Sequence, residues 1–287
     1  MSKIRKVLSI AGIKMAIESA IDFKLSDRCH LFEVEEECVD AVFKIQKSDK
    51  CEAVLWEKIW SEEKYAIFRK DSQKVKVKYN DLEQQEIRWY LEEQEGNPYV
   101  YEINVMDEAI LDAVNPLFFV ELSEFLINYN AMILHSSFIR YKKAGIVFTA
   151  PSGTGKSTQA NLWEKYYDAE ILNGDRTIIK KEEEYYAYGS PYAGSSHIYE
   201  NKCVNLKAIV VLRQAKKNKI RKMKMKEAYL CLISEMAISP VNSKVVEKQS
   251  KWLLQLIEKI PVYMLECLPD KGAVDLLYSE LKEKIDE

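Results

Sequence analysis

The chain has 287 residues, of which 47% are hydrophobic and 30% charged, and a formal net charge of −3. This composition is typical of a globular protein with a hydrophobic core, and the length favours two domains. The small net charge argues against nucleic acid as a partner, and no apolar run reaches the ~18 residues of a membrane-spanning helix. The six cysteines form no C-x-x-C pair, so we expect reduced thiols and a cytoplasmic location.

Residues 1–105 contain short apolar stretches with polar joins and few helical patterns. The predicted strands are 7–15, 41–45, 53–60, 65–69, 75–79, 87–91 and 99–105. Residues 74–79 alternate strictly between lysine and apolar side chains, as a half-buried strand does. We therefore predict a small, β-rich, antiparallel domain at 1–105, whose role the residues do not indicate.

A helix is predicted over 116–129, because Asn115 is a good N-cap and Pro116 suits the first helical position. From residue 132 the pattern becomes mixed α/β, and we predict a second domain at 106–287. Its predicted strands are 132–141, 146–149, 171–172, 177–179, 185–188, 206–212 and 262–268. Its predicted helices are 156–167, 226–237, 243–259 and 272–285.

The strand at 146–149 leads into a loop that contains Gly153 and Gly155 and ends in Lys-Ser-Thr. A strand, a glycine loop and a helix in this order are typical of a P-loop nucleotide-binding unit. Glycines let successive N–H groups turn towards phosphate oxygens, and the helix N-terminus adds partial positive charge. The sequence therefore predicts a nucleotide-binding site here.

Within this loop Lys156 is expected to reach the β- and γ-phosphates, and the Ser157 hydroxyl to bind Mg²⁺. The predicted nucleotide-binding residues are Ser152, Gly153, Thr154, Gly155, Lys156, Ser157 and Thr158. The pattern G-x-x-x-x-G-K-[ST] is matched except at its first position, which is Ala150. The alternative is an ordinary strand-to-helix turn, but it gives no reason for a lysine where the helix dipole disfavours a cation.

Phosphate transfer also needs a carboxylate near the metal and the attacking hydroxyl. Asp175 is the candidate, since it follows the predicted 156–167 helix by one short connection and lies at a strand end. We expect it to act as a metal ligand, as a general base, or as both; a turn residue after Asn173-Gly174 is the alternative. His135, on the strand before the loop strand, is either a core histidine or a site residue.

Eight of the residues between 213 and 226 are Lys or Arg. The simplest interpretation is a solvated hairpin and helix start. The second is a docking surface for an acidic protein or peptide. Nucleic acid is a weaker third, because the rest of the chain supplies no basic field or matching motif.

Residues 134–140 (LHSSFIR) and 145–158 (GIVFTAPSGTGKST) resemble the kinase domain of the HPr kinase/phosphorylase family. That family has a histidine on one strand, a short turn, the phosphate-loop strand, the loop and helix, and then an Asp-Asp-Arg-like segment. Here this segment is residues 173–176 (NGDR). The resemblance covers 132–215 and, more loosely, the C-terminal helices, but not 1–105.

The resemblance implies an α/β fold class: a P-loop kinase domain with a mixed sheet, related to phosphoenolpyruvate carboxykinase, after the small β-rich domain. It implies an ATP- and Mg²⁺-dependent kinase that acts on a serine hydroxyl. The implied catalytic residues are Asp175, His135 and Lys156, and the implied metal ligands are Ser157 and Asp175. HPr kinases proper carry a glutamate at the position of Thr158 and a second aspartate at that of Gly174, so two carboxylates are missing.

Three functions stay open at this point. The first is a kinase whose acceptor is a serine of a protein or peptide, and the second is a small-molecule kinase. The third is an ATP-binding switch or scaffold without transfer, which the missing carboxylates favour slightly. We expect a nucleotide and an acceptor as partners, and neither nucleic acid nor membrane. The founding members of the family form rings, so a homo-oligomer agrees with the resemblance, although no residue here requires one.

Overall fold

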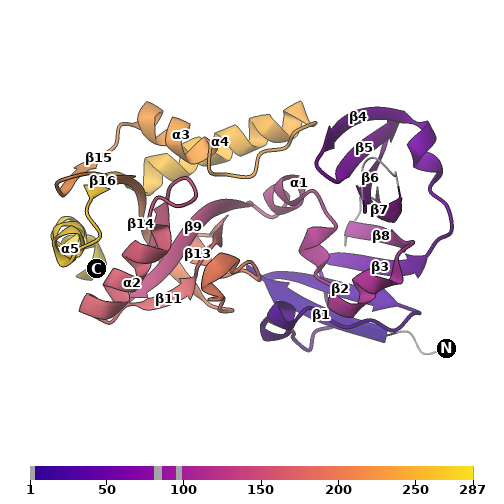
Figure 1. Cartoon of the computed structure of the whole chain (residues 1–287), viewed down its shortest axis with the longest axis horizontal. Helices are drawn as coiled ribbons and strands as arrows, with labels where there is room; N and C mark the ends of the chain where they lie inside the picture. Colours follow the sequence, from indigo (N-terminus) through magenta and orange to yellow (C-terminus); the bar gives the residue numbers. More distant parts are fainter. Residues whose placement is uncertain (1–3, 81–85, 95–98, 287) are drawn as a thin grey trace. The chain divides into compact units, whose positions relative to one another are not determined.

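The computed structural model describes residues 4–80, 86–94 and 99–286. The chain divides into two compact units, Met1–Phe125 with Ser239–Asn242, and Leu126–Ile238 with Ser243–Glu287. Each unit is built on one eight-stranded mixed sheet, and the described helices longer than two turns all belong to the second unit (Figure 1). The fold is therefore mixed α/β with a β-rich N-terminal part, as predicted at this level.

The sheet of the first unit has the strand order β1-β2-β3-β8-β7-β6-β5-β4. Its strands are β1 (Ile4–Ile10), β2 (Ile13–Ser19), β3 (Ala41–Lys47), β4 (Glu57–Glu62), β5 (Tyr65–Lys70), β6 (Gln73–Tyr79), β7 (Ile87–Gln94) and β8 (Tyr99–Val105). The β2–β3 and β3–β8 pairs are parallel, so the prediction of an antiparallel domain is wrong at these two pairs. A parallel pair needs a long crossover, and the segment between β2 and β3 with its 3-10 helix η1 (Asp27–Phe32) supplies one.

The predicted ranges of two strands in this unit include residues that do not belong to one strand. The predicted strand 7–15 is a hairpin of β1 and β2, because Ala11 and Gly12 turn the chain with φ values of 53° and 69°. The predicted strand 53–60 begins as the 3-10 helix η2 (Glu52–Leu55) before β4. Both errors come from apolar turns, which hydrophobic periodicity does not separate from strands.

The two units divide after Phe125 and not at the predicted boundary 105/106. The segment after β8 contains the 3-10 helices η3 (Glu108–Ala113) and η4 (Pro116–Phe118) and the short helix α1 (Leu122–Ile127). Its aromatic rings pack on the first sheet, with Phe119 centred 5.0 Å from Trp89 and Phe125 centred 6.2 Å from Phe43. These contacts hold the segment to the first unit.

The predicted continuous helix over 116–129 is also wrong. Asn115 caps η4 as expected, since its Oδ1 accepts from the Leu117 amide at 3.1 Å. The helix stops because the Val120 carbonyl accepts from Lys76 Nζ at 2.8 Å, and the chain resumes as α1 two residues later. A half-buried lysine from the sheet thus replaces a backbone donor, an interaction that local sequence cannot reveal.

The sheet of the second unit runs β10-β9-β12-β13-β14-β16-β15, and β11 pairs with β9. Its strands are β9 (Ala131–Tyr141), β10 (Ala144–Thr149), β11 (Glu170–Asn173), β12 (Arg176–Lys181), β13 (Tyr185–Tyr188), β14 (Cys203–Gln214), β15 (Lys219–Lys222) and β16 (Val262–Cys267). β10 also pairs in parallel with β14, so β9, β12, β13, β14 and β10 close a circuit.

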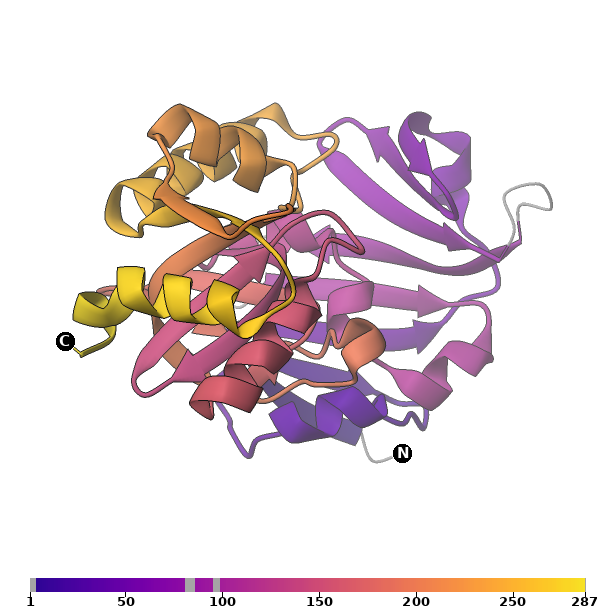
Figure 2. The same ribbon diagram turned by 60° about the vertical axis from the view of Figure 1, so that its left-hand side comes forward.

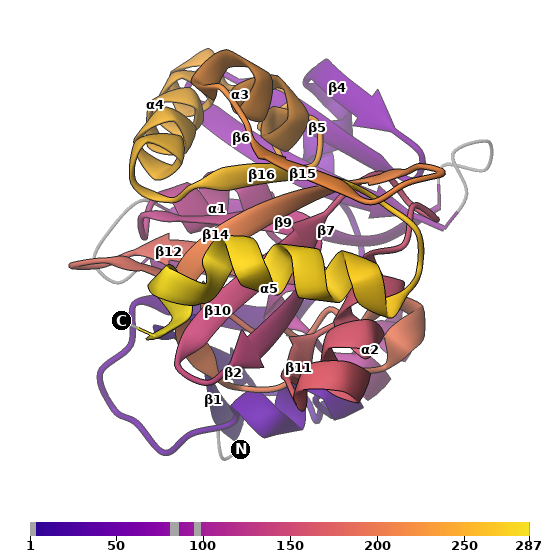
Figure 3. The same ribbon diagram turned by 90° about the vertical axis from the view of Figure 1, so that its left-hand side faces the viewer.

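Two helical layers cover this sheet. The helices are α2 (Lys156–Tyr167), α3 (Met225–Ile233), α4 (Ser243–Lys259) and α5 (Lys271–Asp286). Along β14, Ile209 and Val211 belong to the core with α3 and α4, whereas Val210 and Leu212 belong to the core with α2 and α5. This is the period of two that strand geometry imposes. Figures 2 and 3 show α3 beside α4, and α5 across the strands on the side of α2.

No helix in the described ranges is long and apolar enough to cross a membrane.

Candidate functional site at the glycine loop

The loop 150–155 connects the end of β10 to the start of α2. Gly153 and Gly155 have φ values of 76° and 118°, in the left-handed region that side chains disfavour. Ala150 shows no positive φ and is buried, which explains why alanine is tolerated in the place of the first glycine. Gly155 is the N-cap of α2 and offers no side-chain cap, so the first amides of the helix are available to an anion.

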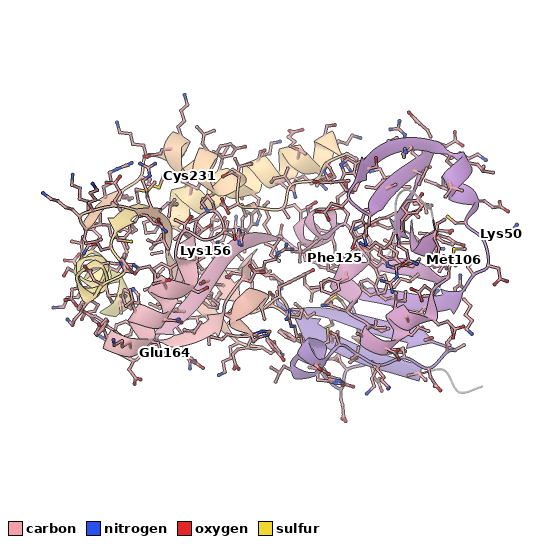
Figure 4. The ribbon with its side chains drawn as sticks, in the orientation of Figure 1. Lys50, Met106, Phe125, Lys156, Glu164 and Cys231 are labelled. Carbon is pink, nitrogen blue, oxygen red and sulfur yellow. The ribbon has the colours of Figure 1, made fainter. Side chains whose placement is uncertain are left out.

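Lys156 folds back over this loop. Its Nζ donates to the carbonyl oxygen of Ala150 at 2.8 Å and to that of Pro151 at 3.4 Å, and the residue is only 8% exposed. Burial lowers the pKa of Lys156, and the charges of Glu235 and Asp175 oppose that shift. The amine thus lies in a loop that supplies partial charges but no direct counter-ion. A phosphate would supply one. Figure 4 labels Lys156 at the start of α2.

His135, from the middle of β9, lies between two carboxylates. Its Nδ1 is 3.1 Å from Glu235 Oε2, and its Nε2 is 3.5 Å from Asp175 Oδ1. The backbone fixes the same arrangement, because the His135 amide donates to the Glu235 carbonyl at 2.9 Å and the Ser136 amide to the Asp175 carbonyl at 2.7 Å. The result is a carboxylate–imidazole–carboxylate row across three segments of the chain.

Asn173 holds the turn that presents Asp175. Its side chain is fully buried, and its Oδ1 accepts from the amides of Asp175 and Arg176 at 3.3 and 3.0 Å. Its Nδ2 donates to the carbonyls of Ser190 and Tyr192, both at 3.0 Å. One amide side chain therefore ties the turn to the segment before η5 (Gly194–Ser196).

Two glycines let the turn and η5 approach closely. A Cβ at Gly194 would lie 2.9 Å from the Cβ of Asp175, and one at Gly174 would lie 1.7 Å from Ser196 Oγ. No side chain fits at Gly174 unless Ser196 moves. An aspartate at position 174 would meet the same steric conflict.

The predicted site residues come together around one hollow of about 260 Å³. The hollow is lined by His135, Ser152, Gly153, Gly155, Lys156, Ser157, Thr158, Gly174, Asp175 and Gly194. Of the predicted nucleotide-binding residues only Thr154 is absent from this lining, and it faces two neighbouring hollows instead.

Three further hollows adjoin the site. One of about 410 Å³ extends from Gly155 and Thr158 to Leu268 and Pro269 after β16. The largest, of about 550 Å³, lies between the loop, the end of β14 and the residues after α3. The third, of about 280 Å³, lies on the far side of His135 and Asp175 and shares Ser234 and Glu235 with the largest one.

Glu235 is the site residue that sequence reasoning missed. It was assigned to a helix over 226–237, but α3 ends at Ile233 and the chain then runs beside β9, with Leu134 bridged to Met236. This turns the Glu235 side chain, which is 12% exposed, towards His135. Residue 235 is a hundred positions from His135, and no local pattern links the two.

Arg213 is exposed and pairs with Glu266 at 3.4 Å on the rim of the largest hollow. For the residues that the structure describes, no group of three or more His, Cys, Asp or Glu side chains could hold a metal ion. Mg²⁺ commonly takes one or two carboxylates together with phosphate oxygens and water. Ser157 and Asp175, on the walls of one hollow, fit that mode of binding.

Comparison with known proteins gives one family. The model of the family described as "SynChlorMet cassette protein ScmC" matches residues 107–270, more than half of the chain. No curated protein matches. The solved structure of the HPr(Ser) kinase/phosphatase from Coxiella burnetii is 10% identical, with a TM-score of 0.33, over 54% of this chain and 99% of that one, which is a distant similarity of fold. The chain belongs to the family of the SynChlorMet cassette protein ScmC.

Proposed function

We propose that this protein is an ATP- and Mg²⁺-dependent kinase that transfers the γ-phosphate to a hydroxyl, with a serine of a protein or peptide as the acceptor. One observation carries the proposal. Lys156, Ser157 and Asp175 line the same hollow at the end of a glycine loop, and His135 joins Asp175 there. These are the parts that phosphoryl transfer needs: a phosphate cradle, a metal site and a base.

In this proposal the loop 150–158 is a P-loop. The uncapped amides at the start of α2 bind phosphate oxygens, and Lys156 exchanges its two carbonyl acceptors for the β- and γ-phosphates. The exchange is favourable because a buried ammonium gains a full negative charge in place of carbonyl dipoles. The 410 Å³ hollow beside Gly155 has room for the base and ribose.

Ser157 and Asp175 would hold Mg²⁺ together with oxygens of the nucleotide. When bound, the ion neutralises charge on the transferring phosphoryl group. The two carboxylates that distinguish HPr kinases proper are absent, at Thr158 and Gly174. Glu235 restores a negative charge on the other side of His135, 3.1 Å from Nδ1.

Asp175 and His135 together take the proton of the acceptor hydroxyl. The proton leaves the hydroxyl for the Asp175 carboxylate as the hydroxyl oxygen attacks the γ-phosphorus. The bond from that phosphorus to the β-phosphate oxygen breaks, and ADP leaves. Nε2 of His135 lies 3.5 Å from Asp175 Oδ1 and can receive the proton. Glu235 accepts from Nδ1–H, which fixes the tautomer and stabilises the imidazolium. The acceptor would approach from the 280 Å³ hollow, which shares His135 and Asp175 with the phosphate hollow.

The proposal is tested by incubating the purified protein with Mg²⁺ and γ-labelled ATP, with a desalted lysate or with a pool of small metabolites. Lys156→Ala is the control, because it removes the phosphate-binding amine. We expect label on a protein or peptide that requires wild-type protein. Label in a small molecule would identify a metabolite kinase instead, and ATP binding without transfer would identify a switch or scaffold.

A further inference from the structure

We propose that the acceptor carries an acidic polypeptide segment that docks on a strip of lysines beside the phosphate loop. This lysine strip runs along β15 and into α3. It consists of Lys216, Lys217, Lys219, Lys222, Lys224 and Lys226. The inference rests on the proposed kinase function and names the chemistry of the substrate.

The lysine strip carries uncompensated charge. All six lysines are exposed, and none of them is in an ion pair with any residue of the described chain. The acids nearby are taken by arginines, because Glu266 pairs with Arg213 and Glu227 pairs with Arg221. Six like charges on one short hairpin and helix start repel one another. Binding of an acidic ligand would reduce this electrostatic repulsion.

The lysine strip follows directly after β14, whose last residue contacts the phosphate loop. Gln214, the last residue of β14, donates through Nε2 to the carbonyls of Gly153 and Thr154 in the phosphate loop, both at 3.4 Å. Arg213 and Gln214 also line the 550 Å³ hollow, which reaches Glu235 and hence the His135 row. A segment bound on the strip would therefore lead through this hollow to the 280 Å³ acceptor hollow, with which it shares Ser234 and Glu235.

Figure 3 shows β15 as the outermost strand, next to β16 and below α3. In Figure 4 several long side chains that end in blue nitrogen atoms project around the labelled Cys231, which lies on α3 and on the wall of the same hollow.

The chemistry of the surface favours a polypeptide over other polyanions. Met225 and Leu230 of α3 are 45% and 58% exposed, so apolar side chains lie among the lysines. A peptide with acidic and apolar residues matches both features, whereas a phosphate backbone has no apolar side chains to cover Met225 and Leu230. An edge strand rich in lysine also discourages pairing between sheets, and that role alone would need no ligand.

The test measures binding apart from catalysis. A fluorescein-labelled peptide, with one serine flanked by alternating Glu and Leu, is titrated with the full chain without nucleotide, and its anisotropy is followed at low and high salt. The matched peptide has Gln in place of Glu. The strip variant is Lys216→Glu/Lys217→Glu/Lys219→Glu. The control variant, Lys244→Glu/Lys248→Glu/Lys259→Glu on α4, makes the same charge change at exposed lysines.

We expect the Glu peptide to bind more tightly than the Gln peptide, to weaken with salt, and to lose about tenfold or more in affinity in the strip variant only. Equal loss in both variants would overturn the proposal, as would tighter binding of an oligonucleotide or of phosphatidylserine vesicles at the strip. The binding assay contains no ATP, so its result does not depend on catalysis. If phosphate transfer fails in the separate labelled-ATP assay, the kinase assignment is refuted but the docking result stands. If the peptide does not bind, the docking proposal is refuted, but transfer to other acceptors stays possible.

Discussion

The turn at Gly174 offers a sharp test of how the site is built, through the substitution Gly174→Ala. The added Cβ would lie 1.7 Å from Ser196 Oγ and 2.7 Å from Ser196 Cβ, so the two side chains cannot both stay in place. Ser196 is held by hydrogen bonds, donating to the Ala193 carbonyl at 2.8 Å and accepting from the Ile198 amide at 3.3 Å. Moving it breaks these bonds and shifts η5.

Overpacking of this kind costs ~1–3 kcal/mol, and each lost hydrogen bond about 0.5–1.5 kcal/mol. We therefore expect Gly174→Ala to lower the free energy of unfolding by about 2–6 kcal/mol. Ser196→Gly alone should cost about 1–3 kcal/mol, because it removes the hydrogen bonds without a clash. The double variant should lose about as much as Ser196→Gly alone, roughly 2–6 kcal/mol less than the sum of the two single losses, because the clash is gone and the hydrogen bonds are lost only once.

Urea denaturation of the wild type, the two single variants and the double variant measures this coupling. Phosphate transfer should fall in parallel with the shift of η5, since Gly194 packs against Asp175. If Gly174→Ala is as stable as the wild type, or if the two losses simply add, the steric account of this turn is wrong.

Three other substitutions test separate parts of the site. Glu235→Gln keeps the shape of the side chain but removes the negative charge beside His135. We therefore expect kcat to fall roughly 10–100-fold while the KM for ATP stays unchanged. A change in KM alone would contradict the role of Glu235 in orienting and stabilising His135. Asn173→Ala should lower the free energy of unfolding by about 2–4 kcal/mol, because four hydrogen bonds around a buried side chain are lost. An unchanged free energy of unfolding in urea denaturation would refute this prediction. Lys156→Met should stabilise the protein at neutral pH and abolish nucleotide binding. Burial lowers the pKa of Lys156, so between this lowered pKa and pH 10.5 the folded chain binds fewer protons than the unfolded chain. Wild-type stability should therefore rise towards that of Lys156→Met as the pH passes through this window. A constant difference in melting temperature across this range would show that Lys156 is not the group responsible.

Much of the second unit could be predicted from the sequence, because its elements have strong local signals. The helices α2 and α4 occupy the predicted ranges 156–167 and 243–259, and the long buried strands β9, β10 and β14 lie where apolar runs are longest. Their apolar patterns alternate between two cores, so the periodicity of the sequence and the packing agree. The loop between β10 and α2 could also be predicted from a local signal, because glycines are needed where φ is positive.

The errors lie where tertiary contacts override local preference. The helix predicted over 116–129 is interrupted by a lysine from β6, and the helix predicted over 226–237 ends early because Glu235 and Met236 pair with β9. The parallel pairs of β2, β3 and β8 depend on a crossover whose path no short window of sequence contains. Glu235 was missed for the same reason, because its relation to His135 exists only once the chain has folded.

The central claim is that phosphate transfer requires Asp175, whereas the phosphate loop is sufficient to bind ATP. The most direct measurement compares Asp175→Asn with the wild type for Mg²⁺-ATP affinity by calorimetry and for transfer of the labelled γ-phosphate in one turnover. The account predicts that transfer is lost and that ATP still binds, because Lys156 and the amides of α2 hold the phosphates. Full transfer by Asp175→Asn would contradict the assigned base and, with it, the proposed mechanism.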